Sequence, residues 1–338
     1  MHAIPSVERP TVAILLPPDN RRLVLSEAAE QRLNNVARVH TTAETSLSMS
    51  LLRELVGGSS IWLTGWGTPP LADLLTDAPD VKLVGHFAGS IRRLIPEHAL
   101  SGGLRVTHAA GAISDSVAEF VLAQILMALR HGDAFNTGMK TGQGWELRDR
   151  YPGRLLGALT VGIVGAGYVG RAVIRLLRAF HATVLLADPT ISEEEARELG
   201  VERVPLSDLI ERCDVVSLHA PLLDATKGLL GTAELGRLRD GALLVNMARS
   251  PLVNEQALVA ELKRGRIRAI LDVFDEEPLP ASSPLRQLSN VYLSPHAAGH
   301  TQDSHWRQGD LIVDEVERFV RGEPLQFEIS SAAMRHMA

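Results

Sequence analysis

Residues 159–295 alternate between short apolar runs and longer stretches in which apolar residues recur at helical spacing. Short runs that are apolar throughout are typical of strands buried on both faces of a sheet, and helices between them favour parallel pairing. The pattern therefore predicts an α/β region built on a doubly wound parallel sheet. The predicted strands are 159–164, 183–187, 214–218, 242–246, 268–273 and 290–294.

The first part of the chain has the same pattern on a smaller scale. Apolar runs at 12–16, 60–64 and 82–86 are separated by stretches with helical spacing, which predicts a small α/β unit. A last helical pattern at about 303–321 is expected to return to this unit, which makes it discontinuous. The predicted domains are residues 108–297 and, on either side of them in sequence, residues 1–107 and 298–338.

One long helix and one irregular segment are predicted ahead of the larger sheet. Ser116 and Glu119 have the S-x-x-E spacing of a capping box, so we expect a helix from Ser116 to about His131. The segment 132–153 is rich in glycine and charged residues and is expected to break regular structure, as an arm or a linker.

The turn after the strand at 159–164 has the glycine spacing G-x-G-x-x-G. Gly165 would permit a tight turn, Gly167 would let the backbone approach a pyrophosphate, and Gly170 would let the helix pack on the strand. We expect the helix to start near Arg171, with its N-terminal amides facing a diphosphate. The turn therefore predicts a dinucleotide site.

Asp188 ends the next predicted strand, 188 − 165 = 23 residues after the first glycine of the turn. An acid at this distance can accept hydrogen bonds from an adenosine ribose and repels a 2′-phosphate, which favours NAD(H) over NADP(H). The alternative is an aspartate at a strand end that only caps the following turn.

Composition excludes several classes of partner. The net charge is −6, with acidic and basic residues interspersed, which argues against a nucleic-acid footprint or a membrane-binding patch. No histidine or cysteine cluster has the spacing of a metal site, and the single Cys213 cannot form an intramolecular disulfide. Without a charged-then-apolar leader or a run of 18 apolar residues, a cytoplasmic protein is expected.

Three side chains capable of chemistry each follow the end of a predicted strand. They are Arg249, Glu277 and His296, and the carboxyl ends of parallel strands meet at one edge, so we expect them to share a site. An arginine can bind a carboxylate through its planar fork, and a histidine paired with a carboxylate can donate a proton near neutral pH. These groups suit the reduction of a 2-oxo acid by hydride transfer. The other histidines, including His86 and His108, have no such context.

Further segments around these residues form a recognisable set. They are 165–170 with Asp188, 215–221 with 226–228, 246–249, 271–274 and 294–299. Together they resemble the D-isomer-specific 2-hydroxyacid dehydrogenase family over about residues 80–320. The resemblance implies two Rossmann-like domains and a homodimer formed through the cofactor domain. It also implies an NAD-dependent enzyme of class EC 1.1.1.- that interconverts a small 2-oxo acid and its D-2-hydroxy acid.

The resemblance also implies roles for individual residues. His296 would be the acid/base, Glu277 its partner, and Arg249 the group that binds the substrate carboxylate and polarises the carbonyl. The implied cofactor contacts are Tyr168 and Val169 at the pyrophosphate beside Gly165, Gly167 and Gly170, Asp188 at the ribose, Ala220, Pro221 and Thr226 on the adenosine side, Asp272 at the nicotinamide carboxamide, and Met247, Ala248, Arg249, His296, Ala298 and Gly299.

Residues 85–93 correspond to the substrate loop of the family. The backbone N–H groups along Ala88, Gly89, Ser90 and Ile91 would hold a carboxylate, because such a nest does not depend on side chains. Arg92 and Arg93 depart from the usual pattern and either favour a substrate with a second anionic group or face solvent.

Two other departures and one expected absence refine the resemblance. Ser250 stands where a glycine is commoner and Asn254 where an aspartate is common, and neither disables the chemistry. No regulatory domain is expected after the last helix, which disfavours the long phosphoglycerate dehydrogenase form.

Two rival functions stay open at this point. Formate oxidation releases a hydride without an O–H proton to remove, and that subfamily typically has glutamine where this chain has Glu277. A dinucleotide-sensing corepressor or binding protein on the same scaffold can retain all three side chains, so only a test for turnover separates it from an enzyme.

Overall fold

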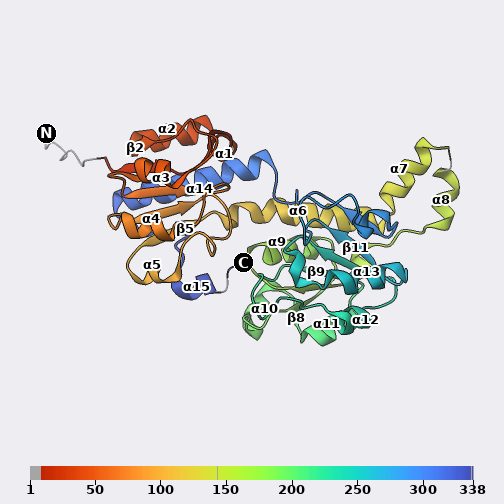
Figure 1. Cartoon of the computed structure of the whole chain (residues 1–338). Coiled ribbons are helices and arrows are strands. Elements are labelled where there is room, and N and C mark those ends of the chain that lie inside the picture. The colour runs from red at the N-terminus through yellow and green to blue at the C-terminus, as the bar shows by residue number, and fades with distance from the viewer. Residues whose placement is uncertain (1–8, 143, 336, 338) are drawn as a thin grey trace. The chain divides into compact units, whose positions relative to one another are not determined.

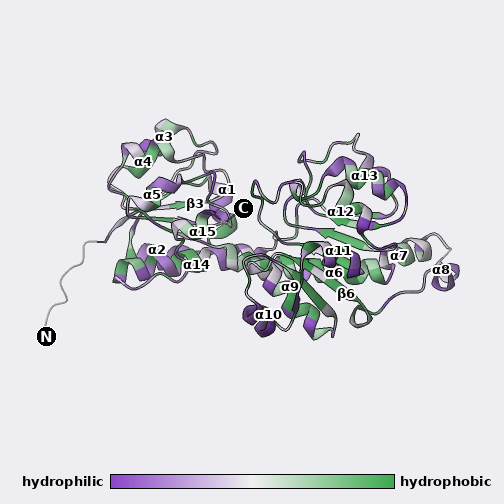
Figure 2. Ribbon diagram, turned by 90° about the horizontal axis from the view of Figure 1, so that it is seen from below, coloured by the Kyte–Doolittle hydropathy of each residue, from purple (hydrophilic) through white to green (hydrophobic). Residues whose placement is uncertain are grey.

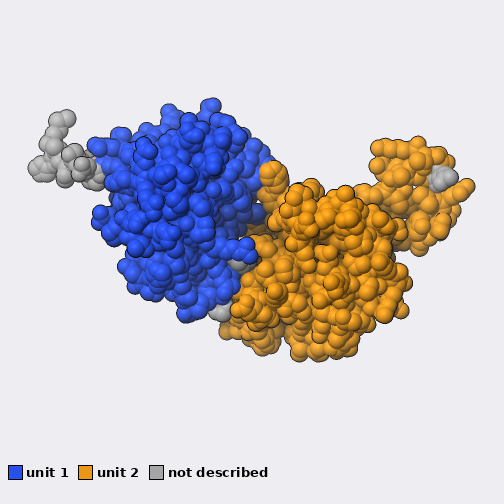
Figure 3. Space-filling view, in the orientation of Figure 1, with its two compact units in different colours: residues 1–113, 301–338 blue, residues 114–300 orange. Residues whose placement is uncertain are grey.

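The computed structural model describes residues 9–142, 144–335 and 337. The chain divides into two compact units, which Figure 3 shows in different colours. Unit 1 consists of residues 1–113 and 301–338, and unit 2 of residues 114–300. The chain therefore leaves unit 1, builds unit 2 and returns for its last helices.

Unit 1 contains a five-stranded parallel sheet in the order β2-β1-β3-β4-β5. Its strands are β1 (Thr11–Ile14), β2 (Arg38–His40), β3 (Ile61–Thr64), β4 (Leu83–His86) and β5 (Arg105–His108). Its helices are α1 (Pro18–Val24), α2 (Glu27–Val36), α3 (Met49–Val56), α4 (Ala72–Asp77), α5 (Glu97–Ser101), α14 (Gln302–Arg321) and α15 (Ser331–Arg335). Leu33 of α2 and Ile312 of α14 pack in one core with β1, and Leu52 of α3 packs in another with Trp62 of β3, so the sheet is buried on both faces.

Unit 2 contains a seven-stranded parallel sheet in the order β12-β11-β10-β9-β6-β7-β8. Its strands are β6 (Thr160–Val164), β7 (Thr183–Ala187), β8 (Glu202–Arg203), β9 (Val215–Leu218), β10 (Leu243–Asn246), β11 (Arg268–Leu271) and β12 (Val291–Leu293). The strand order reverses between β6 and β9, and ligands of open α/β sheets bind outside the carboxyl ends of the strands at such a point. The predicted fold, two Rossmann-like domains with doubly wound parallel sheets, is confirmed.

Unit 2 also contains α-helices. They are α6 (Ala110–Leu129), α7 (Gly132–Lys140), α8 (Gly144–Arg150), α9 (Tyr168–Ala179), α10 (Glu193–Leu199), α11 (Leu206–Arg212), α12 (Thr232–Arg237) and α13 (Glu255–Lys263), with short 3₁₀ helices at Leu156–Ala158, Ser250–Leu252 and Pro284–Gln287. Figure 2 shows the strands of this sheet as hydrophobic and α10 as largely hydrophilic, as expected for a buried sheet under amphipathic helices. The helices α7 and α8 project from the rest of unit 2 (Figure 1).

Three local predictions are wrong. The helix α6 begins at Ala110 rather than at Ser116, and the Ser116 hydroxyl donates to Ala298 O at 3.0 Å instead of capping a helix. The segment 132–153 is not irregular, because its glycines allow close helix contact: a Cβ on Gly138 would lie 2.5 Å from Leu147 of α8. The helix α9 begins at Tyr168 rather than near Arg171, because Gly167 is its N-cap.

The helix α6 is, within the described residues, the one helix long and apolar enough by length and composition to cross a membrane. Its Val117, Val121, Ile125 and Leu129 are each 8% exposed or less and lie four residues apart. This spacing places them on one buried face. The helix is therefore a core helix of the fold.

Candidate active site

The glycine turn lies between β6 and α9, and each of its glycines has a distinct reason to be there. Gly165 has a φ of +95°, and a Cβ there would lie 2.7 Å from the backbone nitrogen of Ala220. A Cβ on Gly170 would lie 2.1 Å from Gly165 O, whereas one on Gly167 would meet nothing within 4 Å. Gly167 therefore leaves open backbone at the N-terminus of α9, where a helix favours an anion.

The carboxylate of Asp188 connects the end of β7 to the glycine turn. Its Oδ2 accepts from Ala166 N at 2.7 Å, and its Oδ1 accepts from the backbone N–H and the hydroxyl of Thr190 at 2.8 and 2.7 Å. The carboxylate therefore caps the following turn, as the alternative interpretation expected, and it is also held beside the turn that would bind a pyrophosphate. It is half-buried, so part of it stays accessible.

The other residues expected at the cofactor surround this turn. Tyr168 is 51% exposed at the first position of α9, and Val169 is half-buried beside it. Ala220 is buried after β9, with its backbone against Gly165. The Thr226 hydroxyl closes the loop after β9 by donating to Pro221 O at 2.5 Å.

His296 and Glu277 form a direct pair. His296 Nδ1 lies 2.8 Å from Glu277 Oε2, and Glu277 Oε1 accepts from the backbone N–H of Phe274 at 3.0 Å. Partial burial opposes ionisation of Glu277, but the hydrogen bonds from His296 and Phe274 and the nearby Arg249 charge hold its pKa below the usual value. Within the described residues His296 Nε2 has no hydrogen-bond partner, and both side chains are partly exposed.

The turn that carries His296 has a strained backbone and is held by hydrogen bonds to Asp272. His296 has a φ of +51°, a left-handed conformation that is unfavourable for a residue with a Cβ. Asp272 is fully buried and accepts from Ser294 Oγ at 2.5 Å and from the backbone N–H groups of Ala297 and Ala298, each at 2.9 Å. The carboxylate of Asp272 therefore fixes the turn, and its contact with a nicotinamide carboxamide stays a prediction.

Arg249 lies on a loop that Asn246 holds at the end of β10. Asn246 Oδ1 accepts from Ala248 N at 3.1 Å, and Asn246 Nδ2 donates to Arg249 O at 2.9 Å. The guanidinium is half-buried and donates to Ala248 O at 2.6 Å. The sequence had not assigned Asn246 a role, although a buried amide at a strand end one turn before an arginine is a recognisable signal.

The proposed substrate loop lies in unit 1, after β4. Among the described residues, the backbone N–H groups of Gly89, Ser90 and Ile91 donate to no backbone or side-chain acceptor. Ala88 and Ile91 are buried, whereas Gly89 and Ser90 are half-buried. The loop therefore has the unpaired donors that a carboxylate requires.

The sequence had not assigned the two histidines that neighbour this loop. His108 Nδ1 lies 2.9 Å from Gly89 O, and burial lowers the pKa of His108, so its neutral ring donates to that carbonyl. His86 Nδ1 lies 3.0 Å from Thr64 Oγ1, and burial together with the neighbouring His108 lowers its pKa to about 4. Strand register aligns Thr64, His86 and His108 at one sheet edge, a juxtaposition that spacing alone does not reveal. Arg92 and Arg93 are exposed.

In unit 2, then, one edge of the sheet carries a glycine turn with a carboxylate bonded to it, and a pair of imidazole and carboxylate near an arginine. The family model for the D-isomer specific 2-hydroxyacid dehydrogenase, NAD binding domain, matches residues 122–298. The chain belongs to the D-isomer specific 2-hydroxyacid dehydrogenase family. The matched residues lie in unit 2, which is its NAD-binding domain, as the glycine turn predicted.

Relatives and solved structures agree with this membership. The chain is 33% identical over 301 residues to D-3-phosphoglycerate dehydrogenase of Methanocaldococcus jannaschii, covering 88% of this chain but only 56% of that protein. It is 35% identical over 262 residues to glyoxylate reductase of Korarchaeum cryptofilum, covering 76% of this chain and 78% of that one. The crystal structure of a phosphoglycerate oxidoreductase from Rhizobium etli has a TM-score of 0.80 and 25% identity, covering 95% of this chain and 99% of that one.

Proposed function

We propose that this protein is an NAD-dependent oxidoreductase that interconverts a small 2-oxo acid and its D-2-hydroxy acid. The observation that carries the proposal is the 2.8 Å contact between His296 Nδ1 and Glu277 Oε2, with Nε2 free of partners within the described residues. An imidazole oriented by a carboxylate is suited to give a proton to a carbonyl oxygen and to take it back. Relatives named glyoxylate reductase and phosphoglycerate dehydrogenase support this substrate class.

The residues of the proposed cofactor site fit a dinucleotide. Open backbone at Gly167, the N-terminus of α9 and the accessible part of Asp188 would hold the pyrophosphate and the adenosine ribose. The remaining proposed contacts are Gly165, Tyr168, Val169, Gly170, Ala220, Pro221, Thr226, Met247, Ala248, Arg249, Asp272, His296, Ala298 and Gly299. NAD(H), when bound, supplies or accepts the hydride.

The protein's own residues would handle the substrate and the proton. Arg249 binds the carboxylate and polarises the carbonyl, because its guanidinium is held at a strand end. His296 Nε2 donates the proton to the carbonyl oxygen during reduction, while Glu277 stabilises the imidazolium. In oxidation the neutral ring accepts the same proton. We propose carboxylate binding also for the unpaired N–H groups of Gly89 and its neighbours.

Turnover with purified protein tests the proposal. NADH oxidation is followed with glyoxylate, hydroxypyruvate, pyruvate and bulkier branched or aromatic 2-oxo acids, and NAD⁺ reduction is followed with formate. Turnover of a 2-oxo acid supports the proposal and identifies the substrate. NADH binding without turnover of any of these supports the corepressor alternative, and turnover of formate alone supports the formate-type alternative.

The helices α7 and α8 are the proposed interface of a homodimer. Met139 and Trp145 on them are 54% and 74% exposed, and Leu155, just beyond α8, is 71% exposed. Exposed apolar side chains on a projecting arm favour burial against another subunit. Sedimentation at micromolar concentration is expected to give a dimer, and a monomer would contradict the proposal. We also propose a cytoplasmic location, without a nucleic-acid or membrane partner, from the interspersed charge and the single, buried Cys213.

A further inference from the structure

Two separate loops of unit 2 carry Arg249 and Glu277, the proposed partner of His296. Arg249 follows β10, and Glu277 follows β11, so α13 and β11 lie between them in sequence. Each loop is held internally, by Asn246 in one case and by the Phe274 N–H in the other. Strand pairing fixes only the starts of the two loops, where Asp272 N donates to Asn246 O at 3.1 Å. A contact farther along the loops is needed to fix the separation of Arg249 and Glu277.

A side-chain hydrogen bond joins the two loops. Ser250, the residue after Arg249, donates through Oγ to Asp275 Oδ1 at 2.6 Å. Ser250 is 9% exposed, so the bond is shielded from water on one side. An O–H bond to a carboxylate is short and stronger than a bond between neutral groups. Asp275 lies two residues before Glu277, so the bond joins the residue next to Arg249 to a residue in the turn that ends at Glu277.

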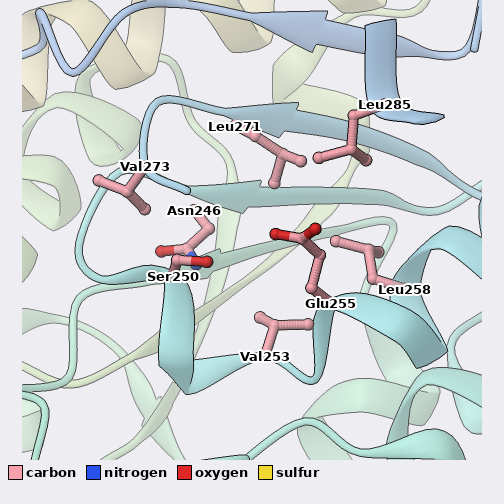
Figure 4. Close-up of a pocket in the computed structure, with 8 residues that line it drawn as sticks. All are labelled: Asn246, Ser250, Val253, Glu255, Leu258, Leu271, Val273 and Leu285. Carbon is pink, nitrogen blue, oxygen red and sulfur yellow. The ribbon is translucent and has the colours of Figure 1, made fainter. Parts of the chain in front are cut away.

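Glu255, the first residue of α13, lies near Asp275. Burial and the Asp275 charge raise the pKa of Glu255. Figure 4 shows Ser250, Asn246 and Glu255 around one small pocket, with the Glu255 carboxyl turned toward Leu271. The rest of the lining is Val253, Leu258, Val273 and Leu285. Because this lining is mostly apolar, it lowers the local dielectric and strengthens the polar contacts at its edge.

We propose that Ser250 and Asp275 are positioning residues that set the separation between Arg249 and the His296–Glu277 pair. The proposal rests on the proposed function, because it assigns the two residues to the alignment of a substrate carboxylate with the proton donor. The 274–277 turn therefore cannot shift away from the arginine loop without losing the bond between Ser250 and Asp275. Neither residue is placed in contact with substrate or cofactor.

A double-mutant cycle with Ser250→Ala and Asp275→Ala tests the tether. Each single variant is expected to lower kcat/KM for the 2-oxo acid about tenfold, within the loss of up to about a hundredfold that a 1 Å misplacement produces. The loss should fall partly on KM, through Arg249, and partly on kcat, through His296. The double variant should be no worse than either single one, because both remove the same bond.

Two further variants distinguish the loss of this bond from other effects of substitution near the site. Asp275→Asn keeps an acceptor oxygen for Ser250 and should retain most of the activity. Glu276→Gln is the matched control, because Glu276 is an exposed neighbouring acid without a hydrogen bond or ion pair among the described residues, and it should behave as wild type. NADH affinity, measured by fluorescence, should be unchanged in all variants. The proposal is wrong if the losses in kcat/KM of the two single variants multiply in the double variant. It is also wrong if Ser250→Ala has the kcat/KM of the wild type.

A second measurement keeps the tether testable if the wild-type protein turns over no 2-oxo acid, which would refute the proposed function alone. Hydrogen–deuterium exchange reports local opening of the backbone around Asp275. Ser250→Ala should accelerate exchange in a peptide covering 273–278 and leave a peptide over α11 unchanged, while Glu276→Gln changes neither. Unchanged exchange over 273–278 in Ser250→Ala would overturn the tether whatever the reaction is.

Discussion

Replacing Asp272 by asparagine should destabilise the turn that carries His296 while leaving the rest of unit 2 intact. The carboxylate accepts three hydrogen bonds, from Ser294 Oγ and from Ala297 N on Oδ1, and from Ala298 N on Oδ2. An amide has one acceptor oxygen. If it replaces Oδ1, the two bonds to that atom remain, and the NH₂ group faces the donor of Ala298.

The expected loss follows from burial. Asp272 is 0% exposed and Ala298 is 3% exposed, so water does not replace the missing acceptor. A hydrogen bond to a charged group contributes about 1.5–3 kcal/mol, and a buried unsatisfied donor costs about 1–3 kcal/mol. These ranges describe largely the same lost contact and are not summed, so the free energy of unfolding should fall by about 1.5–3 kcal/mol. The left-handed φ of His296 makes its turn sensitive to the loss, and kcat should fall about a hundredfold if His296 moves by 1 Å.

Urea unfolding, steady-state kinetics and NADH titration together decide the case. Ser294→Ala is the graded control, because it removes one of the three bonds and should cost only about 1 kcal/mol. Unchanged NADH affinity would mean that Asp272 acts through the turn, whereas a weakened one would support its predicted contact with the carboxamide. An Asp272→Asn protein whose free energy of unfolding is within about 0.5 kcal/mol of the wild-type value and whose kcat is normal would refute the reasoning.

Three other substitutions test the remaining assignments. His296→Ala should lower kcat by ~10²–10⁴ with NADH affinity retained, because it removes the proton donor, and near-normal turnover would exclude that role. The pKa of Glu277 is lower in the folded chain than in the unfolded chain, where it is near 4.5. The ionised carboxylate therefore stabilises the fold above pH 4.5, and this contribution is lost as the pH falls through the pKa of the folded chain. Urea unfolding of Glu277→Gln should therefore show a deficit near neutral pH that disappears in acid, and a deficit independent of pH would contradict this. Wild-type kcat/KM should favour NAD(H) over NADP(H) by at least about 2 kcal/mol, and Asp188→Ala should reduce this preference. Equal kcat/KM values with the two cofactors in the wild type would reject the role of Asp188.

Sequence pattern alone determined the order of elements and the type of site. Buried parallel strands must be apolar throughout, so the strands from β6 to β12 were readable, except for the two-residue β8 at Glu202–Arg203. The glycine turn was readable because its spacing answers steric demands at Gly165 and Gly170 that no other residue meets. Arg249, Glu277 and His296 could be chosen because each follows a strand end, although selecting Glu277 from an acidic run needed the family resemblance.

Tertiary structure decided everything that depends on which elements become neighbours. The glycines of 132–153 suggest broken structure in sequence, but Gly138 and Gly144 are contact points between α7 and α8. Ser116 has the spacing of a cap, yet its partner is Ala298, distant in sequence. The hydrogen bonds that hold the site also depend on tertiary structure. Asp272 contacts the His296 turn, and Ser250 contacts Asp275, only after β10, β11 and β12 pair. Local spacing encodes propensity and strand-end position, whereas hydrogen bonds between loops depend on sheet register, which long-range packing sets.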